Sequence, residues 1–289
     1  MADIRALLAV QKPTGTVEPE LPAGTPLRPA LLDVRDEPAF AAGHVAGSGH
    51  VPAEFLKSRR TELPPRDHPV LVLADAAAAA RTSAETLRDL GYASVAWLDA
   101  PLADLGETAR QTGAAARLWR SNAFLSDIAA DIPRGRAADL AAGSGRDAAF
   151  LAMNGFDVEA CDESPEALEM ARSLARRCGV SVETRIANLE ARSFTLPAAH
   201  YSLVTCFRFL HRQLFPVMVR ALAPGGHLVY ETYRLGQERY GRPRRAKFLL
   251  APGELKREFE ALGVEVLRHE EPEPPGGPVT ARLWGRKPD

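Results

Sequence analysis

The residues best suited to chemistry in this chain of 289 residues are two acids and the glycine-rich turn between them. Residues 139–147 read Asp-Leu-Ala-Ala-Gly-Ser-Gly-Arg-Asp, and Asp162 follows at the end of the next apolar segment. Small residues at Ala141, Gly143 and Gly145 let a ligand approach the backbone closely, and the helix that begins after them offers free N–H groups. The Asp162 carboxylate can accept hydrogen bonds from both hydroxyls of a ribose. The pattern is therefore typical of a site for an adenosyl cofactor.

The glycine turn alone does not distinguish a nicotinamide dinucleotide from S-adenosylmethionine. The spacing Gly143-x-Gly145-x-x-Ala148 also satisfies the dinucleotide fingerprint, including the acid at Asp162. Asp139 separates the two cofactors, because a carboxylate at this strand end repels a pyrophosphate but attracts the amino group of S-adenosylmethionine. The early acid therefore favours S-adenosylmethionine.

Apolar periodicity predicts an α/β sheet around this turn. Seven predicted strands alternate with helices and the last two are neighbours in the chain, which indicates a doubly wound, Rossmann-like, mostly parallel sheet with an antiparallel end. Ligands bind at the carboxyl ends of such strands, where the acids and glycines fall. The predicted strands are 137–141, 157–162, 182–188, 201–206, 227–233, 264–269 and 279–285, and the predicted helices are 124–130, 165–177, 211–222 and 253–262.

Residues 117–289 resemble the class I S-adenosylmethionine-dependent methyltransferases. The Gly-Ser-Gly-Arg-Asp form is closest to the tellurite-resistance and thiopurine methyltransferase-like branch, and the Pro224-Gly-Gly226 turn before a late strand is a second feature of the superfamily. The resemblance implies S-adenosylmethionine as cofactor. It assigns Asp139, Ala141, Gly143, Ser144, Gly145 and Arg146 to the amino-acid part of the cofactor, Asp162 to the ribose, Asn188 and Leu189 to the adenine, and Cys206 and Phe207 to the pocket under the methyl group.

The chain departs from the family pattern at three places. The family usually has glycine at Ala141, an acid at Asn188 and Phe-Asp at Tyr201-Ser202. Ala141 adds one methyl group near the ligand, and Asn188 can still accept a hydrogen bond from the adenine amino group through its amide oxygen. We expect the change at Ser202 to affect a structural contact rather than chemistry.

The acceptor side is predicted where loops leave the fourth and fifth strands of this sheet. Methyl transfer from a sulfonium is an in-line displacement, so the protein mainly has to align a nucleophile and exclude water. His211 is the candidate base because the ordinary pKa of histidine is about 6.5; a histidine satisfied by its own backbone is the open alternative. The candidate contacts to an anionic acceptor are Arg208, Arg212, Glu231 and Tyr233.

Residues 233–248 are locally basic and interleaved with aromatic residues. Three interpretations stay open for this segment: a lid that selects anionic or planar acceptors, a solvated connection, and an RNA-binding patch.

The N-terminal part carries a second set of motifs. Strand-like segments at 30–34, 69–73 and 94–98 and a helical stretch at 81–90 predict a small parallel-sheet α/β domain. The strand that ends Leu32-Asp-Val-Arg35 is followed by Gly43-His-Val-Ala-Gly-Ser-Gly-His-Val-Pro52. These two motifs resemble the signature of the rhodanese family.

In that family the chemistry rests on a cysteine after the central strand. Counting from the elements on both sides places this position at Ala74, and residues 74–80 read Ala-Asp-Ala-Ala-Ala-Ala-Ala. The first cysteine of the chain is Cys161, and only a thiolate can carry the sulfur. We therefore expect a catalytically inactive rhodanese-like module, and leave open that it binds a protein partner.

Length and composition are those of an ordinary globular protein with two domains. We place the boundary in residues 106–116, which lack apolar periodicity, and so expect domains 1–112 and 113–289. The net charge of −1 gives no global field that would attract nucleic acid or an anionic membrane. A nucleic-acid partner is therefore not expected.

The three cysteines, Cys161, Cys178 and Cys206, are isolated and form no zinc or disulfide pattern, so no metal is expected. The N-terminus lacks the pattern of a signal peptide, and no apolar run approaches the roughly 20 residues of a membrane span. These features predict a cytoplasmic location without membrane attachment.

Together the motifs predict an S-adenosylmethionine-dependent methyltransferase with an inactive rhodanese-like module. Its acceptor is expected to be a small molecule that is anionic or reacts through a thiol or another chalcogen, because the branch resemblance and the sulfur-linked first domain agree. A non-catalytic regulatory or scaffold protein with two degenerate domains and an RNA methyltransferase are the open alternatives.

Overall fold

The computed structural model describes residues 28–98, 102 and 110–289. These described residues form two compact units, one up to Arg120 and one from Ser121 to Asp289. The segment before Arg120 contacts the first unit: the Ala116 N–H donates to the Ser48 carbonyl over 2.9 Å, and Leu118 packs against the core of that unit. The domain boundary between residues 112 and 113 stays our expectation. The first 27 residues and part of the predicted linker at 106–116 lie outside the described residues.

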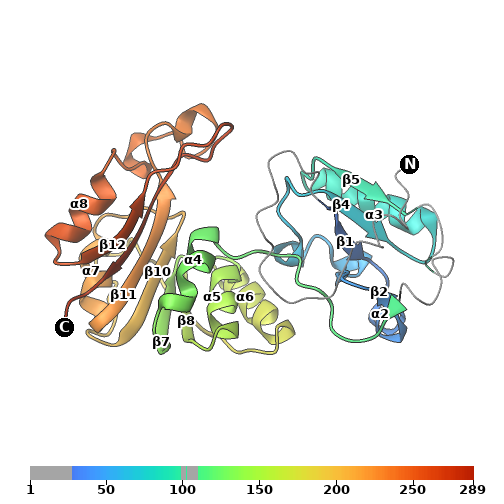
Figure 1. The fold of residues 1–289 in the computed structure, drawn as a ribbon, viewed down its shortest axis with the longest axis horizontal. Helices are drawn as coiled ribbons and strands as arrows, with labels where there is room; N and C mark the ends of the chain where they lie inside the picture. The colour runs from blue at the N-terminus through green and yellow to red at the C-terminus, as the bar shows by residue number, and fades with distance from the viewer. Residues whose placement is uncertain (1–27, 99–101, 103–109) are drawn as a thin grey trace. The chain divides into compact units, whose positions relative to one another are not determined.

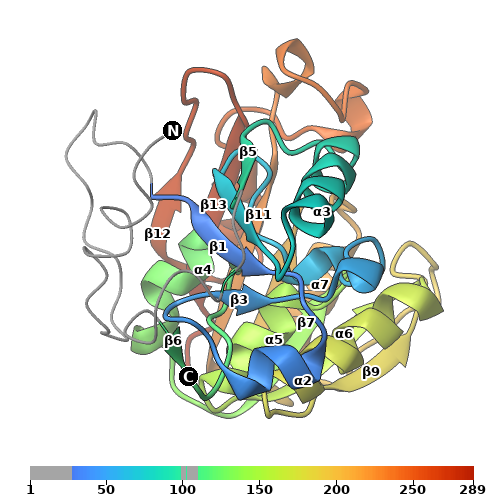
Figure 2. The same ribbon diagram turned by 90° about the vertical axis from the view of Figure 1, so that its right-hand side faces the viewer.

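The first unit contains the predicted parallel sheet. Its strands follow the spatial order β3-β1-β4-β5, with every pair parallel, and α3 packs against β4 and β5 (Figures 1 and 2). A separate antiparallel pair joins β2 and β6. The elements are β1 (Ala30–Asp33), α2 (Glu37–Ala42), β2 (His44–Val45), β3 (Gly49–His50), β4 (Val70–Leu73), α3 (Ala77–Asp89), β5 (Val95–Trp97) and β6 (Arg110–Gln111).

The alanine run after β4 forms the first turn of α3, so this helix begins earlier than the predicted 81–90. Alanine has the highest helix propensity, which explains why the run extends the helix instead of forming a loop. Ala74 precedes the helix and is buried in the core of the unit.

The second unit is built on the predicted seven-stranded sheet. The strand order is β12-β13-β11-β10-β7-β8-β9, and every neighbouring pair is parallel except the two pairs that include β13. The fold is therefore a doubly wound α/β sheet with an antiparallel end, as the sequence predicts. The strands are β7 (Arg136–Leu140), β8 (Asp157–Asp162), β9 (Glu183–Ile186), β10 (Tyr201–Phe207), β11 (Leu222–Tyr233), β12 (Glu265–Glu270) and β13 (Thr280–Arg286).

Helices cover both faces of this sheet, with α4, α5 and α6 on one face and α7 and α8 on the other (Figure 1). Local signals fix their starts: the Asn122 side chain accepts from the Leu125 N–H at α4, and the Ser164 hydroxyl accepts from the Ala167 N–H at α6. The helices are α4 (Ala123–Ile128), α5 (Arg146–Met153), α6 (Pro165–Arg177), α7 (Leu214–Ala221) and α8 (Glu254–Ala261).

Two predicted boundaries shift around the Pro224-Gly-Gly226 turn. The helix predicted at 211–222 starts only at Leu214, and β11 begins at Leu222 instead of residue 227. The cause is the register with β10, in which Tyr201 pairs with Leu222 and Leu203 already pairs with His227. The extra residues on β11 form an irregularity that contains the turn.

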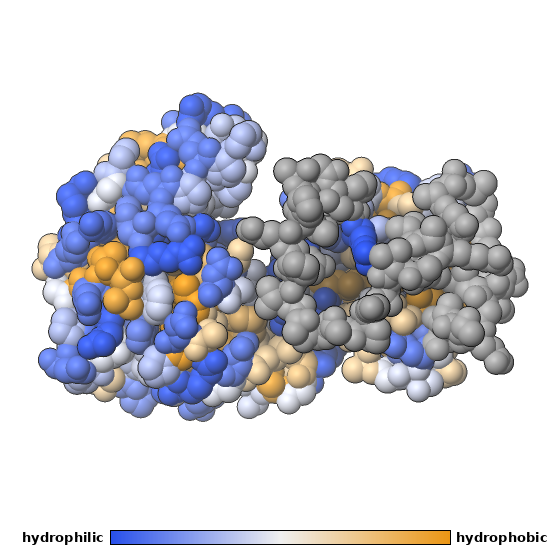
Figure 3. Space-filling view, viewed as in Figure 1, coloured by the Kyte–Doolittle hydropathy of each residue, from blue (hydrophilic) through white to orange (hydrophobic). Residues whose placement is uncertain are grey.

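None of the helices in the described residues is both long and apolar enough to cross a bilayer. The face of the second unit seen in Figure 3 is mostly hydrophilic, with small separate apolar areas. Among the same described residues, no group of three His, Cys, Asp or Glu side chains is placed to hold a metal ion.

The pairing of His227 with Trp284 predicts a pH-dependent stability. Trp284 Nε1 donates to His227 Nδ1 over 2.9 Å, and burial, together with the charge of Arg286, lowers the pKa of His227. Because the unfolded histidine has the higher pKa, about 6.5, stability is complete above that pH and is lost as the pH falls below it. We expect the unfolding free energy to decrease between about pH 7.5 and about pH 5.5.

Denaturant unfolding at several pH values measures this decrease, and the slope should be smaller in His227→Gln. His200→Gln, at an exposed histidine of the same unit, should keep the slope of the wild type. If the unfolding free energy of His227→Gln fell with pH as steeply as that of the wild type, the pH dependence would not come from His227.

Candidate functional site

The glycine turn after β7 has a left-handed backbone that small residues allow. Ala141, Gly143 and Gly145 have φ values of 56°, 52° and 76°. A Cβ atom added at Gly143 would meet nothing within 4 Å, whereas one at Gly145 would collide with Ala171 of α6. Gly143 therefore leaves the turn open on one side, and Gly145 is required for the packing of α6 against the start of α5.

Asp162, at the end of β8, fixes this turn. Its Oδ2 accepts from the Gly143 N–H over 2.8 Å, and its Oδ1 accepts from the Ser164 N–H over 2.9 Å. A carboxylate oxygen can accept more than one hydrogen bond. The Asp162 carboxylate can therefore hold the turn and accept from ligand hydroxyls at the same time.

Asp139 is a buried carboxylate with one unpartnered oxygen. The Thr205 hydroxyl donates to Oδ1 over 2.8 Å, but Oδ2 has no hydrogen-bond partner in the described part of the chain. Burial and the negative charge of Asp147 raise the pKa of Asp139 well above its ordinary value. A buried acceptor without a donor is unfavourable. The open turn and this orphaned oxygen fit the amino group and backbone of an adenosyl amino-acid cofactor.

A second group of polar residues joins this site, and sequence reasoning missed most of it. The Asn122 N–H donates to Asp147 Oδ1 over 2.6 Å, and Asn122 Nδ2 donates to Glu231 Oε2 over 2.7 Å. The Thr280 hydroxyl donates to the other Glu231 oxygen over 2.9 Å. Asn122 thus links the starts of α4 and α5 to β11 and β13. The available signals were the capping position of Asn122 and the last residue of the glycine motif.

Asp147 is partly buried next to these groups. Burial raises its pKa, while the Asn122 N–H and the nearby charges of Arg208 and Arg146 act in the opposite direction. Asp147 and Asp139 therefore form an acidic pair directly beside the turn.

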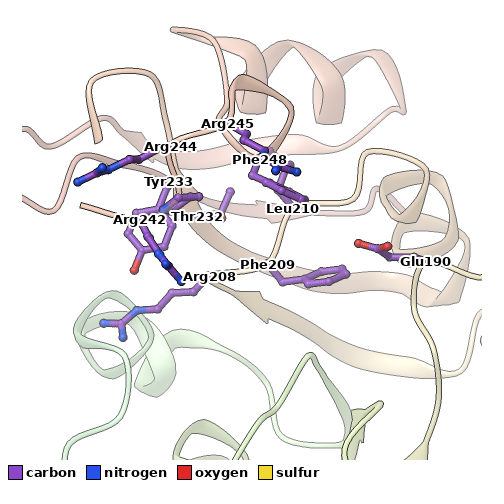
Figure 4. A pocket seen from close by; sticks show the side chains of 11 residues that line it. Glu190, Arg208, Phe209, Leu210, Thr232, Tyr233, Arg242, Arg244, Arg245 and Phe248 are labelled. Atoms are coloured by element: carbon purple, nitrogen blue, oxygen red, sulfur yellow. The ribbon is translucent and has the colours of Figure 1, made fainter. Parts of the chain in front are cut away.

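A cavity of about 840 Å³ lies next to these residues (Figure 4). It is formed by the segment after β10, the end of β11, and part of the basic segment 233–248. In the view of Figure 4, Arg208, Arg242 and Arg244 project on one side, Glu190 lies on the other, and the Phe209 ring lies between them. The lining residues are Glu190, Arg208, Phe209, Leu210, Thr232, Tyr233, Arg242, Pro243, Arg244, Arg245 and Phe248.

Arg208 connects the cavity to the acidic pair. It lines the cavity, and its charge acts on Asp147. Its φ of 57° is unusual for a residue other than glycine, and its N–H donates to the Glu231 carbonyl over 2.7 Å. Such backbone conformations persist where the surroundings enforce them, often at binding sites.

Of the residues expected to contact the acceptor, Arg208 and Tyr233 line the cavity and the others do not. Arg212 forms an ion pair with Glu254, and His211 lies outside the lining. Glu231 is held by Asn122 and Thr280, as described above.

The residues expected near the adenine and the methyl group differ in their exposure to solvent. Asn188 is exposed, and its Oδ1 accepts from the N–H of the cavity residue Glu190 over 2.9 Å, whereas Leu189 is buried in the core. Phe207 is buried at the end of β10. Cys206 lies in the core with Tyr230 and Phe215, because alternate residues of β10 face opposite sides and Thr205 faces Asp139. Burial also raises the pKa of the Cys206 thiol.

Comparison with known proteins agrees with both sets of motifs. Residues 137–226 match the family model of a methyltransferase domain, and residues 20–102 match that of a rhodanese-like domain. No curated protein matches the chain.

Among solved structures, the chain is similar to TehB from Haemophilus influenzae, with 19% identity, 58% of this chain and 62% of that chain covered, and a TM-score of 0.47. An S-adenosylmethionine-dependent methyltransferase from Mesorhizobium loti has 20% identity, 58% and 99% coverage, and a TM-score of 0.46. One from Methanosarcina mazei has 18% identity, 56% and 97% coverage, and a TM-score of 0.45. The match spans less than two thirds of the TehB chain, and likenesses at this level do not bear on what this chain acts on.

The two family matches, the strand order and the glycine turn agree. The chain therefore carries a region that matches a rhodanese-like domain, followed by a region that matches a methyltransferase domain.

Proposed function

We propose that this protein transfers the methyl group of S-adenosylmethionine to a small anionic acceptor bound in the arginine-lined cavity. The observation that carries the proposal is the position of this cavity beside the cofactor residues. Arg208 lines the cavity and acts on Asp147 after the glycine turn, and Glu190 lines it and is bonded to Asn188. A cation-lined cavity next to a cofactor turn is suited to an anionic acceptor.

On the cofactor side, each role follows from the donors and acceptors present. The orphaned oxygen of Asp139 would accept from the cofactor ammonium group, the turn from Ala141 to Arg146 would surround the amino-acid part, and Asp162 would accept from the ribose hydroxyls. Asn188 and Leu189 would flank the adenine. When bound, S-adenosylmethionine supplies a methyl group on a positively charged sulfur.

On the acceptor side, the arginines would orient the acceptor so that its nucleophilic atom points to the cofactor, and the aromatic rings of the cavity would exclude water. We favour a thiol or another chalcogen as the nucleophile, because it ionises near neutral pH and needs no strong base. His211 stays our candidate base for an acceptor that must lose a proton, although it lies outside the cavity lining.

We propose that the rhodanese-like domain is catalytically inactive. Ala74 occupies the place of the sulfur-carrying cysteine, and its side chain packs in the core of the first unit. The first unit contains no cysteine, because the first one in the sequence is Cys161. The domain would then serve as a binding module for a protein partner.

Replacing Asp162 tests the cofactor site. Asp162→Ala removes the acceptor for the ribose hydroxyls and releases the turn, so we expect about 100-fold weaker binding of S-adenosylmethionine and of its demethylated product. Isothermal titration calorimetry measures both affinities. Asp157→Ala, at the exposed opposite end of the same strand, is the matched control and should bind like the wild type.

Retained affinity in Asp162→Ala would show that the turn assignment is wrong. Absence of binding of either compound to the wild type would instead support the alternative of a non-catalytic scaffold protein.

The raised pKa of Asp139 predicts proton release on cofactor binding. Without a cation, burial keeps this carboxyl protonated to a higher pH than usual, and an ammonium group next to it lowers its pKa again. The association constant of S-adenosylmethionine should therefore rise with pH across the interval between the two pKa values. Calorimetry in buffers of different ionisation enthalpy counts the released protons.

Methylthioadenosine lacks the amino-acid part and should bind without this proton release, and Asp139→Asn should abolish it for S-adenosylmethionine. Proton release that persists in Asp139→Asn would assign the effect to another group.

A further inference from the structure

The arginines around the basic segment fall into two groups. Those outside the cavity are paired with glutamates: Arg234 with Glu273 over 3.0 Å, Arg239 also with Glu273, and Arg212 with Glu254. Those in the cavity lining have no carboxylate within ion-pair distance in the part of the chain that the structure describes; they are Arg208, Arg242, Arg244 and Arg245. Within residues 233–248, Arg234 and Arg239 are thus paired with Glu273, whereas Arg242, Arg244 and Arg245 have no carboxylate within ion-pair distance in the described part of the chain.

Side-chain and backbone bonds hold this segment closed. The Leu235 N–H donates to the Leu250 carbonyl and the Leu250 N–H donates to the Tyr233 carbonyl, over 2.9 and 3.0 Å, so the two ends of the segment are joined. At its middle, Gln237 Nε2 donates to the Arg242 carbonyl and Gln237 Oε1 accepts from the Val279 N–H over 2.8 Å. The segment therefore forms a closed loop attached to Val279, the residue before β13.

Arg212 fixes the other side of the loop. Besides its ion pair with Glu254, it donates to the carbonyls of Lys247 and Leu249 over 3.1 and 3.0 Å. Glu254 in turn accepts from the Ala251 N–H over 2.7 Å. The loop thus carries three of the four cavity arginines, Arg242, Arg244 and Arg245, and Arg208 joins them from the end of β10; Glu190 is the single acid among the lining residues.

The excess of positive charge indicates the number of anionic groups that the cavity accepts. All four side chains are exposed, so an anion can reach each guanidinium group. A carboxylate or phosphate is usually satisfied by one or two guanidinium groups. Four unpaired arginines therefore suit an acceptor with at least two anionic groups.

The remaining lining residues indicate the shape of the acceptor. Phe209, Tyr233 and Phe248 contribute aromatic rings to the cavity, and such rings bind planar ring systems by stacked or edge-on contacts. We propose that the methyl acceptor is a planar aromatic molecule that carries two or more carboxylate or phosphate groups. This inference rests on the proposed function and adds the class of the acceptor.

Calorimetry of the full chain saturated with the demethylated cofactor tests this class. The probes are isophthalate, with two carboxylates on a ring, phenyl phosphate, with a doubly charged phosphate on a ring, benzoate, with one carboxylate, and glutarate, with two carboxylates and no ring. We expect isophthalate to bind at least about tenfold more tightly than benzoate or glutarate. The comparison of isophthalate with phenyl phosphate shows which anionic group the arginines prefer.

Variants identify the cavity as the binding site. Arg242→Gln and Arg244→Gln should each weaken isophthalate binding about tenfold or more while the affinity for the demethylated cofactor stays unchanged. Arg239→Gln, on the same loop but paired with Glu273 outside the cavity lining, is the matched control and should leave isophthalate binding unchanged.

Equal binding of isophthalate and benzoate, or equal effects of Arg242→Gln and Arg239→Gln, would overturn the proposal. Displacement of isophthalate by a short single-stranded RNA that binds more tightly would overturn it in favour of an RNA acceptor. If isophthalate binds but neither S-adenosylmethionine nor its product does, the proposed methyl transfer fails while the assigned ligand class of the cavity stands.

Discussion

The hydrogen bonds of Asp162 to the turn between β7 and α5 are the constraint on which the second unit depends. The turn needs left-handed backbone at Ala141, Gly143 and Gly145, and it stays in place because the Gly143 N–H is bonded to the carboxylate at the end of the neighbouring strand. Gly145 at the same time lets α6 approach α5. This short turn therefore sets the spacing of two strands and two helices. It also leaves an open backbone surface at the carboxyl ends of the strands.

At the carboxyl ends of the strands, acidic residues lie beside the glycine turn and basic residues line the neighbouring cavity. Asp139 and Asp147 lie beside the turn, and the unpaired arginines line the cavity after β10. On the proposed function, a cofactor with an ammonium and a sulfonium group meets the acids, and an anionic acceptor meets the arginines. Each ligand is attracted to its own part of the site and repelled from the other, which favours the order needed for methyl transfer.

The sequence predicted both main sheets, the seven strands of the second one and the glycine turn, because these depend on local periodicity and on short motifs such as the one that ends at Asp147. It missed the two-residue strands β2, β3 and β6, which are too short to show a periodicity. The residues it missed are joined over long distances in the chain. Asn122 reaches Glu231 on β11, and Glu190 lines the same cavity as residues of the loop closed by Leu235 and Leu250. The periodicity of a single helix or strand does not show which residues from distant parts of the chain come into contact.

Arg208 and Arg212 show most directly what could not be predicted from the sequence. Both follow β10, and from the sequence both are candidates to bind an anion. Arg212 meets Glu254 at the start of α8 and becomes a fixed part of the loop, whereas Arg208 has left-handed backbone, no acidic partner within ion-pair distance in the described chain, and access to the cavity. Because an arginine is available to a ligand only where the fold has not already neutralised it, the positions of the glutamates, rather than those of the arginines, decide where the anion site lies.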